Sequence, residues 1–471
     1  MDKQNKAMYL LVFEYYETSI LFGYYVYGDK LPSIMKMSRK FNMAPDTIRS
    51  AIDLLQKKGY VETNAKKTSK VIYLSNDESI QKLAKTYFAT HKEGFIDLYK
   101  SQPFIFDQLT INAIQNIDED TEVVLESLLT EAAEDPFRIP ILFYFHLLRT
   151  FRNDLILNLY WEMVRYTRFA YLKDHDEEAP NLKNSLKDTH LRTLTALKER
   201  NTDKILKSFL PTSKDINSWV KKGRRSYEIE AAEQIPFQWN IYRQRPQICY
   251  SLTSHLIKEI ANEHYQSESF LPSLTKFSED FNISISTARR TIRILNDLGL
   301  TESLHGKGTY VRKTMGEINF ENSEILVGLH YYLDSLQILT LTIREVFLFT
   351  LRSSNQQSVN SLLQEFRRLL DHNRSYYAFN HGLQFISQNC PLASIREIYA
   401  KLDDLLIWGY PYARLRLKNK SLNDVYRSII QNATENLRTG DLEAFARGWE
   451  LLMKHESEQV REMLKLKGKE Q

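Results

Sequence analysis

The chain has 471 residues, which is too long for one ordinary hydrophobic core and indicates about three or four domains. Hydrophobic residues make up 43% of it and charged residues 26%, which excludes a disordered chain and favours a soluble, ordered, helix-rich protein. The 63 basic and 59 acidic residues leave a formal net charge of +4, so charge alone selects no class of partner.

The cysteine content and the apolar segments indicate a protein of a reducing compartment. Cys249 and Cys390 lie far apart and are not spaced with other metal-type ligands, so we predict no disulfide framework and no metal site. The N-terminus lacks the apolar segment and cleavage site of a signal peptide. The most apolar long stretch, residues 325–343, contains polar and ionisable side chains that are costly in lipid, so it is predicted to be a buried helix. We expect a cytoplasmic protein without a membrane partner.

An internal repeat is the most informative feature of the sequence. Residues 31–62 align without a gap to residues 271–302, at a constant offset of 240, and 13 of these 32 positions are identical. Unrelated segments would share only about two. The shared residues are of many types, so low complexity does not explain the match. We infer that the chain carries two copies of one duplicated unit of about 235 residues.

In chain order, the first predicted elements are three helices. Apolar residues recur at helical spacing over about Lys6–Phe22, which predicts a long amphipathic helix. Ser33 follows a proline and can cap a short second helix that ends near Phe41. A third helix is predicted over about Pro45–Lys58, and Gly59 closes it.

A hairpin and a long helical segment follow. Residues 60–62 and 71–73 are predicted to pair as two strands. Three helices followed by a hairpin predict a winged helix-turn-helix domain over residues 1–76. From 77 to 238 glycines are few and apolar residues recur at the helical period, so this segment is predicted to be an all-α domain.

The second copy repeats this pattern. A long helix is predicted over about Gln247–Glu263, and Ser273 caps the next, short helix. The short helix ends near Asn282, because Asn suits a left-handed turn between two helices that meet steeply. The third helix is predicted over about Ser286–Leu298 and closes at Gly299.

The rest of the second copy completes the predicted architecture. Residues 300–302 and 309–311 are predicted to form the second hairpin, which completes a winged helix over residues 239–315. Residues 316–471 show the helical period again and predict a second all-α domain. The predicted fold class is therefore mainly α, with two winged helix-turn-helix domains each followed by an all-α domain.

Each copy resembles the winged helix of GntR-type transcription regulators. That family has a Leu-Pro-Ser run, a third helix that opens with Thr-Val-Arg, and a Gly-x-Gly-Thr-Phe-Val wing. The second copy matches with Leu-Pro-Ser at 271–273, Thr-Ala-Arg at 287–289 and Gly-Lys-Gly-Thr-Tyr-Val at 306–311. The first copy keeps the first two motifs, but its wing segment, 66–71, has lost both glycines. The resemblance implies double-stranded DNA as the partner.

DNA contacts are expected on the third helix and the wing of each copy. A third helix fits the major groove and needs short polar and cationic side chains in its first turn, and a wing along phosphates needs cations or glycines. By the resemblance, Thr47 and Thr287 contact phosphate, and Arg49 and Arg289 contact base edges or backbone. The predicted DNA-contacting residues are Ser33, Thr47, Arg49, Lys66, Lys67 and Lys70 in the first copy, and Ser273, Ser286, Thr287, Arg289, Arg290, Arg293, His305, Gly306 and Lys307 in the second.

These charges also have alternative interpretations. The arginines and lysines could form an ordinary solvated face. The first winged helix could be a protein-interaction module, since its wing glycines are gone. The basic run at 221–225 is predicted to be an exposed linker, and phosphate contact between the two modules is the alternative.

The all-α domains are expected to carry regulation. In GntR-type regulators a helical domain in this position binds a small effector and forms a dimer interface, so the resemblance implies both. Phe-His at 145–146 and Asn-His at 380–381, each followed by an Asn, loosely match a motif of that branch. Its metal-binding version has an acid or Asn one turn before the His, where this chain has Leu142 and Tyr377, so we predict no metal and no cofactor. Four histidines could either line a pocket or be ordinary core residues, namely His146, His190, His381 and His455.

The function predicted from the sequence is regulation of transcription by sequence-specific binding of double-stranded DNA, with a small-molecule effector and a homodimer as further expectations. The chain is predicted not to be an enzyme, because it has no phosphate-binding glycine loop, Gly-x-Ser-x-Gly, His-Glu-x-x-His or Cys-x-x-Cys. A replication-initiator or partition protein with tandem winged helices is the alternative. Two units in one chain could read unequal half-sites, since Arg290 and Arg293 replace Ser50 and Asp53.

Overall fold

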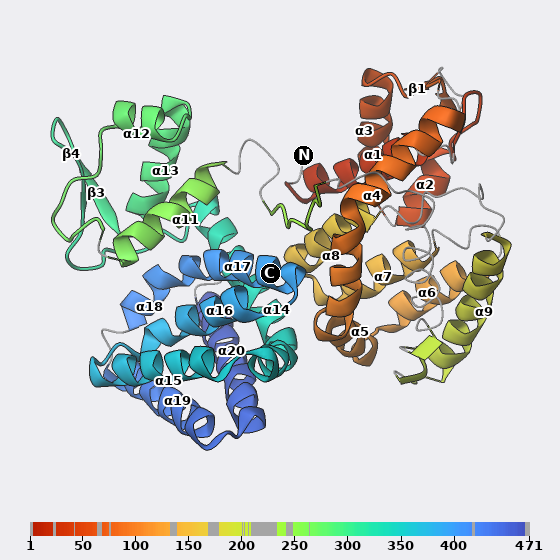
Figure 1. Cartoon of the computed structure of the whole chain (residues 1–471). Coiled ribbons are helices and arrows are strands. Elements are labelled where there is room, and N and C mark those ends of the chain that lie inside the picture. The colour runs from red at the N-terminus through yellow and green to blue at the C-terminus, as the bar shows by residue number, and fades with distance from the viewer. Residues whose placement is uncertain are drawn as a thin grey trace. The chain divides into compact units, whose positions relative to one another are not determined.

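The protein divides into two compact units. The computed structural model describes residues 3–21, 25–41, 43–63, 68–74, 77–131, 139–167, 179–199, 201, 203–205, 207–208, 233–241, 248–262, 264–416 and 420–466. The first unit comprises residues 1–102, 110–152 and 157–237, and the second comprises residues 103–109, 153–156 and 238–471. Helices dominate both units, and the sheets formed by the described residues are two-stranded, so the predicted mainly α fold class is confirmed (Figure 1).

The first unit opens with the predicted three helices and hairpin. These elements are α1 (Lys3–Leu21), α2 (Ile34–Phe41), α3 (Pro45–Lys57), β1 (Val61–Glu62) and β2 (Lys70–Val71). The hydroxyl of Ser33 accepts a hydrogen bond of 3.2 Å from the backbone N–H of Lys36 and so caps α2. Tyr15 of α1 meets Phe41 of α2 edge to face at 5.2 Å between ring centroids, and both side chains are buried.

The remaining elements of the first half are helices. They are α4 (Asp77–Ser101), η1 (Gln102–Phe104), α5 (Phe106–Gln115), α6 (Glu119–Glu131), α7 (Ile139–Leu148), η2 (Arg149–Phe151), α8 (Asp154–Thr167) and α9 (Ala179–Lys198). Within the first unit, α8 is joined to α1. The indole of Trp161 donates to a carboxylate oxygen of Glu14 at 3.1 Å, and Arg165 lies 3.2 Å from the other oxygen. The first helix of the winged helix is thus fastened to the helical segment that follows it.

The second unit repeats the winged helix. Its elements are α11 (Ile248–Ala261), α12 (Leu274–Asp280), α13 (Ile285–Asp297), β3 (Thr301–Leu304) and β4 (Gly308–Val311). Ser273 caps α12 by accepting a hydrogen bond from the backbone N–H of Lys276 at 3.3 Å. Asn282 has a φ of 48°, so the predicted left-handed turn between the second and third helices is confirmed in this copy.

The repeat found in the sequence extends to individual hydrogen bonds. The Ser38 hydroxyl donates to the carbonyl of Met43. At the equivalent positions of the second copy, the Ser278 hydroxyl donates to the carbonyl of Ile283. A backbone bond of 2.8 Å ties residue 31 to residue 69, and another of the same length ties residue 271 to residue 309. Gly59 and Gly299, which close the third helices, have φ values of 78° and 71°. Both copies therefore make the same turn and anchor the same strand.

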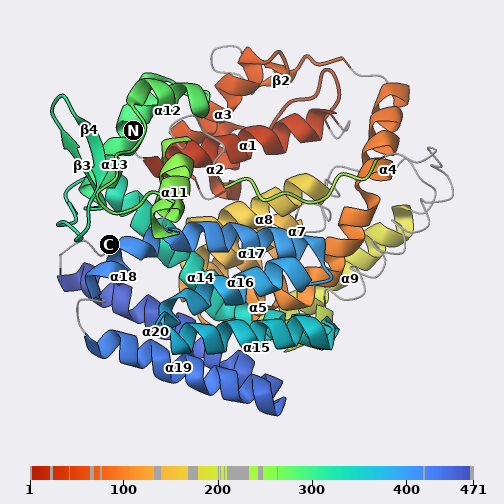
Figure 2. The same cartoon turned by 60° about the vertical axis from the view of Figure 1, so that its left-hand side comes forward.

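A helical bundle completes the second unit. Its elements are α14 (Ser323–Ser353), α15 (Gln356–Asp371), η6 (Ser375–Tyr377), α16 (Ala378–Asn389), α17 (Ala393–Leu406), η7 (Ile407–Gly409), α18 (Tyr410–Arg416), α19 (Lys420–Thr439) and α20 (Leu442–Leu466). The predicted buried helix is the first part of α14, where Ile325, Leu329 and Leu336 are at most 1% exposed. Helices α15 and α19 lie side by side (Figure 2). No helix in the described ranges is long and apolar enough to cross a membrane.

Close packing of aromatic rings against glycines fills this bundle. A Cβ atom on Gly328 would lie 2.1 Å from the ring of Trp408, and one on Gly382 would lie 2.6 Å from the ring of Trp449. Both indoles are at most 1% exposed. The glycines therefore let two large rings enter the core, and the ring of Trp408 packs against α14 near its start.

Candidate nucleic-acid interface

The start of α13 is a cluster of three hydroxyl side chains. Ser284 caps the helix by accepting a hydrogen bond of 3.1 Å from the backbone N–H of Thr287. Its Oγ also lies 2.7 Å from the hydroxyl of Ser286 and 2.8 Å from that of Thr287. Ser284 and Ser286 are exposed and Thr287 is half-buried. The first turn of the helix therefore presents short polar groups, which is what an approach to bases and phosphates requires.

The rest of α13 separates an inner from an outer face. Ala288, Ile292 and Leu295 are buried against the domain core. Arg289 and Arg293, one turn apart, are exposed on the outer face with Ser286. Within the described part of the chain, Arg289 has no ion-pair partner. The outer face thus carries a cation that is available to an anionic ligand.

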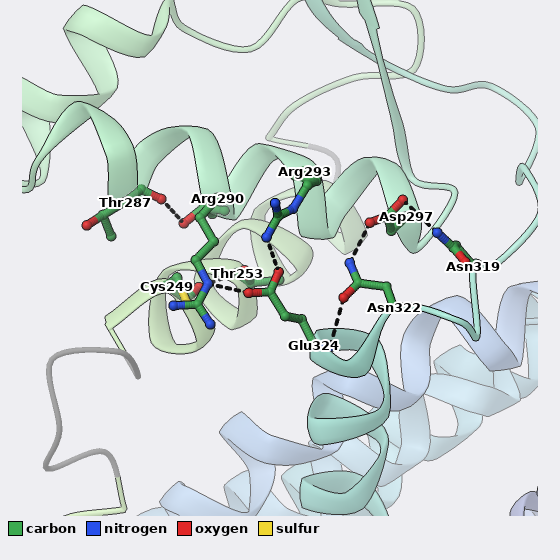
Figure 3. Close-up of polar contacts among 10 residues, drawn as sticks. Cys249, Thr253, Thr287, Arg290, Arg293, Asp297, Asn319, Asn322 and Glu324 are labelled. Atoms are coloured by element: carbon green, nitrogen blue, oxygen red, sulfur yellow. Dashed lines mark hydrogen bonds and ion pairs between the residues drawn. The ribbon is translucent and has the colours of Figure 1, made fainter. Parts of the chain in front are cut away.

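Arg290 and Arg293 are both bound by Glu324 in the first turn of α14 (Figure 3). The Nε of Arg290 donates to one carboxylate oxygen of Glu324, and Nη2 of Arg293 donates to the other at 2.8 Å. Arg290 also stacks over the ring of Tyr250, with 5.7 Å between the guanidinium carbon and the ring centroid. The predicted DNA contacts Arg290 and Arg293 are therefore engaged by the protein itself in this structure.

The charge state of Glu324 follows from these contacts. Burial penalises its ionised form, but the hydrogen bonds from Arg293 and Arg290 outweigh that penalty and hold the pKa of Glu324 below its usual value. Its side chain is 10% exposed, against 32% for Arg290 and 60% for Arg293. Glu324 is an ionised, nearly buried acid beside the outer face of α13. Sequence reasoning missed it, because an acid in a first turn is common and nothing in the pattern links it to arginines of another helix.

The segment between the wing and α14 is fastened to the end of α13. The backbone N–H of Asn319 donates to the carbonyl of Asp297 at 2.8 Å, and the Asn322 side chain donates to the Asp297 carboxylate at 2.6 Å. The same Asn322 caps α14 by accepting from the N–H of Glu324 at 2.9 Å. The backbone N–H of Gly316 donates to the carbonyl of Gly299 at 2.9 Å. Helices α13 and α14 are therefore joined by the segment itself as well as by Glu324.

The wing of the second copy is a complete hairpin with a glycine tip. Strands β3 and β4 pair over four residues each, from Thr301 with Val311 to Leu304 with Gly308. His305, Gly306 and Lys307 form the tip and are all exposed. Gly306 and Gly308 have φ values of 74° and 109°, which favour glycine at both positions. The predicted wing contacts of this copy therefore lie together at one exposed turn.

The first copy presents a different third helix. Thr47, a predicted phosphate contact, is 2% exposed, so its side chain lies in the domain core. Arg49 is 57% exposed and pairs with Asp46 in the same helix. The hydroxyl of Ser50, the counterpart of Arg290, donates to the carbonyl of Asp46 at 3.0 Å. This helix carries fewer cations than α13, and an acid of its own binds the arginine.

The wing of the first copy is shorter. Strands β1 and β2 pair over two residues each, and Lys70 is exposed with its Nζ 5.7 Å from the centre of the Tyr27 ring. Lys66 and Lys67, the other predicted contacts in this wing, lie outside the described residues, as does the basic run at 221–225.

The histidines considered as pocket residues lie in different surroundings. His146 is 5% exposed in α7. His381 is partly buried 3.9 Å from Glu365, and burial lowers its pKa despite that carboxylate. His455 is half-buried in α20, and His190 lies in α9, where its side chain is outside the description. No group of three or more His, Cys, Asp or Glu side chains in the described ranges could hold a metal ion.

Tandem winged helix-turn-helix domains, each with a short wing, define the class of protein. The family described as "Bacterial regulatory proteins, gntR family" matches residues 9–71 and again residues 251–311. These two segments coincide with the winged helices of the two units. The chain therefore carries the gntR-type winged helix twice, and both the resemblance inferred from the sequence and the internal duplication are confirmed.

Several known proteins are similar to parts of the chain. The Uxu operon regulator of Haemophilus influenzae is 27% identical over 194 residues, which cover 40% of this chain and 68% of that protein. The solved structure of a Streptococcus agalactiae GntR protein is 16% identical and covers 45% of this chain and 99% of its own, with a TM-score of 0.20. The structure of McbR/YncC of E. coli is 11% identical and covers 48% of this chain and all 100% of its own, with a TM-score of 0.24.

Proposed function

We propose that this protein regulates transcription by binding double-stranded DNA through both winged helices. The observation that carries the proposal is the outer face of α13, where exposed Ser286 and Arg289 follow a capped helix start and adjoin a glycine-tipped wing. A helix of this kind fits the major groove while a wing lies along phosphates. The same fold recurs in the first copy with Arg49 in the place of Arg289.

The proposed DNA-contacting residues are those predicted from the sequence, but they differ in how accessible they are to DNA. Arg289, His305, Gly306 and Lys307 are exposed and need no rearrangement to meet DNA. Thr47 is buried, so the first copy relies on Arg49 and its wing lysines. The two copies would then read unequal half-sites.

The helical segments supply the regulatory part of the proposal. We propose the domain boundaries 1–76, 77–238, 239–315 and 316–471, with a small effector bound in one or both helical domains and with assembly into a homodimer. An effector alters DNA affinity only if it binds two arrangements of the protein with different affinity. The joined helices α13 and α14 offer the route by which the second helical domain acts on its winged helix. The proposal needs no catalysis, and it places the protein in the cytoplasm with bacterial DNA.

The match to a protein named as an operon regulator favours transcription over the replication-initiator alternative. The deciding experiment measures binding of the full chain to the DNA upstream of its own gene across a salt series. Wild type is compared with Arg49→Ala, Arg289→Ala and the double variant, and Arg367→Ala, an exposed arginine of α15, is the control.

We expect steep salt dependence, weaker binding by both single variants, the weakest binding by the double variant, and no change in the control. Loss with Arg289→Ala alone would make the first copy an interaction module. If wild type bound no DNA, the proposed function would be wrong.

A further inference from the structure

We propose that Glu324 holds Arg293 away from DNA in the free protein, so that DNA phosphate and Glu324 compete for this arginine. The inference rests on the proposed function and assigns a residue outside the winged helix to the control of DNA affinity. Glu324 contacts no DNA in this scheme. It acts through Arg293 and is a positioning residue.

The placement of Arg293 makes it the arginine for which DNA can compete. Arg293 lies one turn beyond Arg289 on the exposed outer face of α13, and its side chain is 60% exposed although it donates to Glu324 at 2.8 Å. A long side chain with this exposure can turn toward a phosphate without moving the helix. Arg290 differs, because its side chain is 32% exposed and stacks over Tyr250. We therefore assign the exchange to Arg293 and a fixed role to Arg290.

Because two arginines bind one carboxylate, little free energy is needed to release Arg293. Removing the only partner of a nearly buried acid leaves an uncompensated charge and is strongly unfavourable. Here Arg290 stays on the other oxygen of Glu324 when Arg293 leaves. Glu324 consequently remains paired in both states, and the free energy needed to release Arg293 is that of one half-exposed hydrogen bond.

The position of Glu324 gives the competition a regulatory meaning. Glu324 lies in the first turn of α14, a helix of 31 residues in the bundle of the second unit, and Asn322 fixes that turn to α13. A shift of this turn away from α13 would release Arg293 to DNA. By reciprocity, DNA that captures Arg293 would weaken the junction between the two helices. The first copy cannot do this through the same positions, since Ser50 and Asp53 replace the two arginines.

The test is Glu324→Gln, which keeps the size of the side chain and removes its charge. The control is Glu317→Gln, which removes the same charge from an exposed position in the preceding segment. Binding of the full chain to a random-sequence duplex is measured across a salt series, because this electrostatic effect does not need the operator. We expect Glu324→Gln to bind more tightly and to steepen the slope of log affinity against log salt by part of about one unit, because wild type releases Arg293 to DNA only part of the time. Its advantage over wild type should then shrink by up to about threefold between roughly 50 and 200 mM salt.

The variant Arg293→Gln completes the cycle. In wild type, Arg293→Gln should reduce the salt slope. Combined with Glu324→Gln, it should abolish the gain in DNA affinity that Glu324→Gln gives alone. A general electrostatic effect of the lost negative charge would persist in the double variant and would also be seen with Glu317→Gln. Thermal melts followed by circular dichroism establish that each variant is folded. Should Glu324→Gln fail to fold, Arg293→Gln alone decides: an unchanged slope overturns the inference.

The two proposals fail in distinguishable ways. If wild type and Arg289→Ala bind the duplex equally weakly and without salt dependence, the proposed function is wrong. If wild type binds and Arg289→Ala weakens it, but Glu324→Gln binds no more tightly than Glu317→Gln, the proposed function stands and the inference is wrong.

Discussion

Asn322 joins Asp297, at the end of the third helix of the second winged helix, to the start of the bundle. Its side-chain N–H donates to the Asp297 carboxylate at 2.6 Å, while its side-chain oxygen accepts from the N–H of Glu324 at 2.9 Å. One side-chain amide thus caps the start of α14 and binds the end of α13. The relative setting of α13 and α14 depends on this side chain as much as on the ion pairs of Glu324.

Replacing Asn322 with Ala should cost more than loss of an ordinary helix cap. An N-cap alone is worth about 1 kcal/mol, and the bond to Asp297 adds about 1.5 kcal/mol or more because its acceptor is charged. Asn355→Ala is the control, since Asn355 caps α15 by accepting from Ser358 at 2.8 Å. Urea unfolding of the full chain measures both. Equal losses would show that the Asp297 bond contributes nothing to stability.

The glycines that close the two third helices should differ in their tolerance of Ala. Both have positive φ, so each Ala substitution costs about 1–2 kcal/mol from backbone strain. A Cβ on Gly59 meets nothing within 4 Å, whereas one on Gly299 lies 2.7 Å from the backbone oxygen of Gly316. Gly299→Ala should therefore destabilise the protein more than Gly59→Ala. Thermal unfolding of the two variants side by side tests this, and the reverse order would contradict the packing described for the segment after the wing.

Lys307 at the tip of the second wing should contribute to DNA affinity without contributing to stability. The residue is exposed and lies between the two glycines of the turn. Lys307→Ala should weaken binding of all duplexes by a similar factor and reduce the salt slope by about one unit. Lys454→Ala, an exposed lysine of α20, is the control and should change neither quantity. A loss confined to one DNA sequence would instead indicate base contact.

The buried Asp403 of α17 should make the bundle less stable as pH rises. Burial raises the pKa of Asp403 to about 7, although Lys258 and the side chain of Asn380 oppose the shift. The folded protein then holds a proton that the unfolded chain has lost between about pH 4 and 7, so the free energy of unfolding falls across that window. Asp403→Asn removes this contribution.

The stability of Asp403→Asn relative to wild type should therefore increase with pH, at no more than about 1.4 kcal/mol per pH unit. Urea unfolding at a series of pH values measures the difference. Asp404→Asn serves as the control, because Asp404 is 54% exposed at its side chain. A difference between Asp403→Asn and wild type that is independent of pH would show that Asp403 is ionised throughout.

The winged helices could be predicted from the sequence because their signals are local. Ser33 and Ser273 cap the second helices, and the glycines that close the third helices take the left-handed conformation. Helix α13 begins at Ile285, one residue before its predicted start at Ser286, because Ser284 takes the cap position. Such boundaries depend on which of several adjacent hydroxyls takes the cap position.

Contacts between distant segments could not be predicted in this way. Glu324 meets Arg290 and Arg293 across 31 to 34 residues, and the periodicity of α14 is equally consistent with an exposed acid. The burial of Thr47 was also missed, because a threonine at a helix start is as compatible with a core as with a surface. Helix patterns fix which elements form, while tertiary packing decides which polar groups remain available.

The presence of both winged helices on one polypeptide has a consequence for dose. Subunits of an ordinary dimer separate on dilution, so their combined affinity for DNA weakens as the number of protein molecules in the cell falls. Two domains tied by a peptide chain keep a fixed local concentration near one another, and the second contact becomes an intramolecular event. Occupancy of a double site would then vary with the first power of protein concentration, and a cell could keep such a site filled with few molecules.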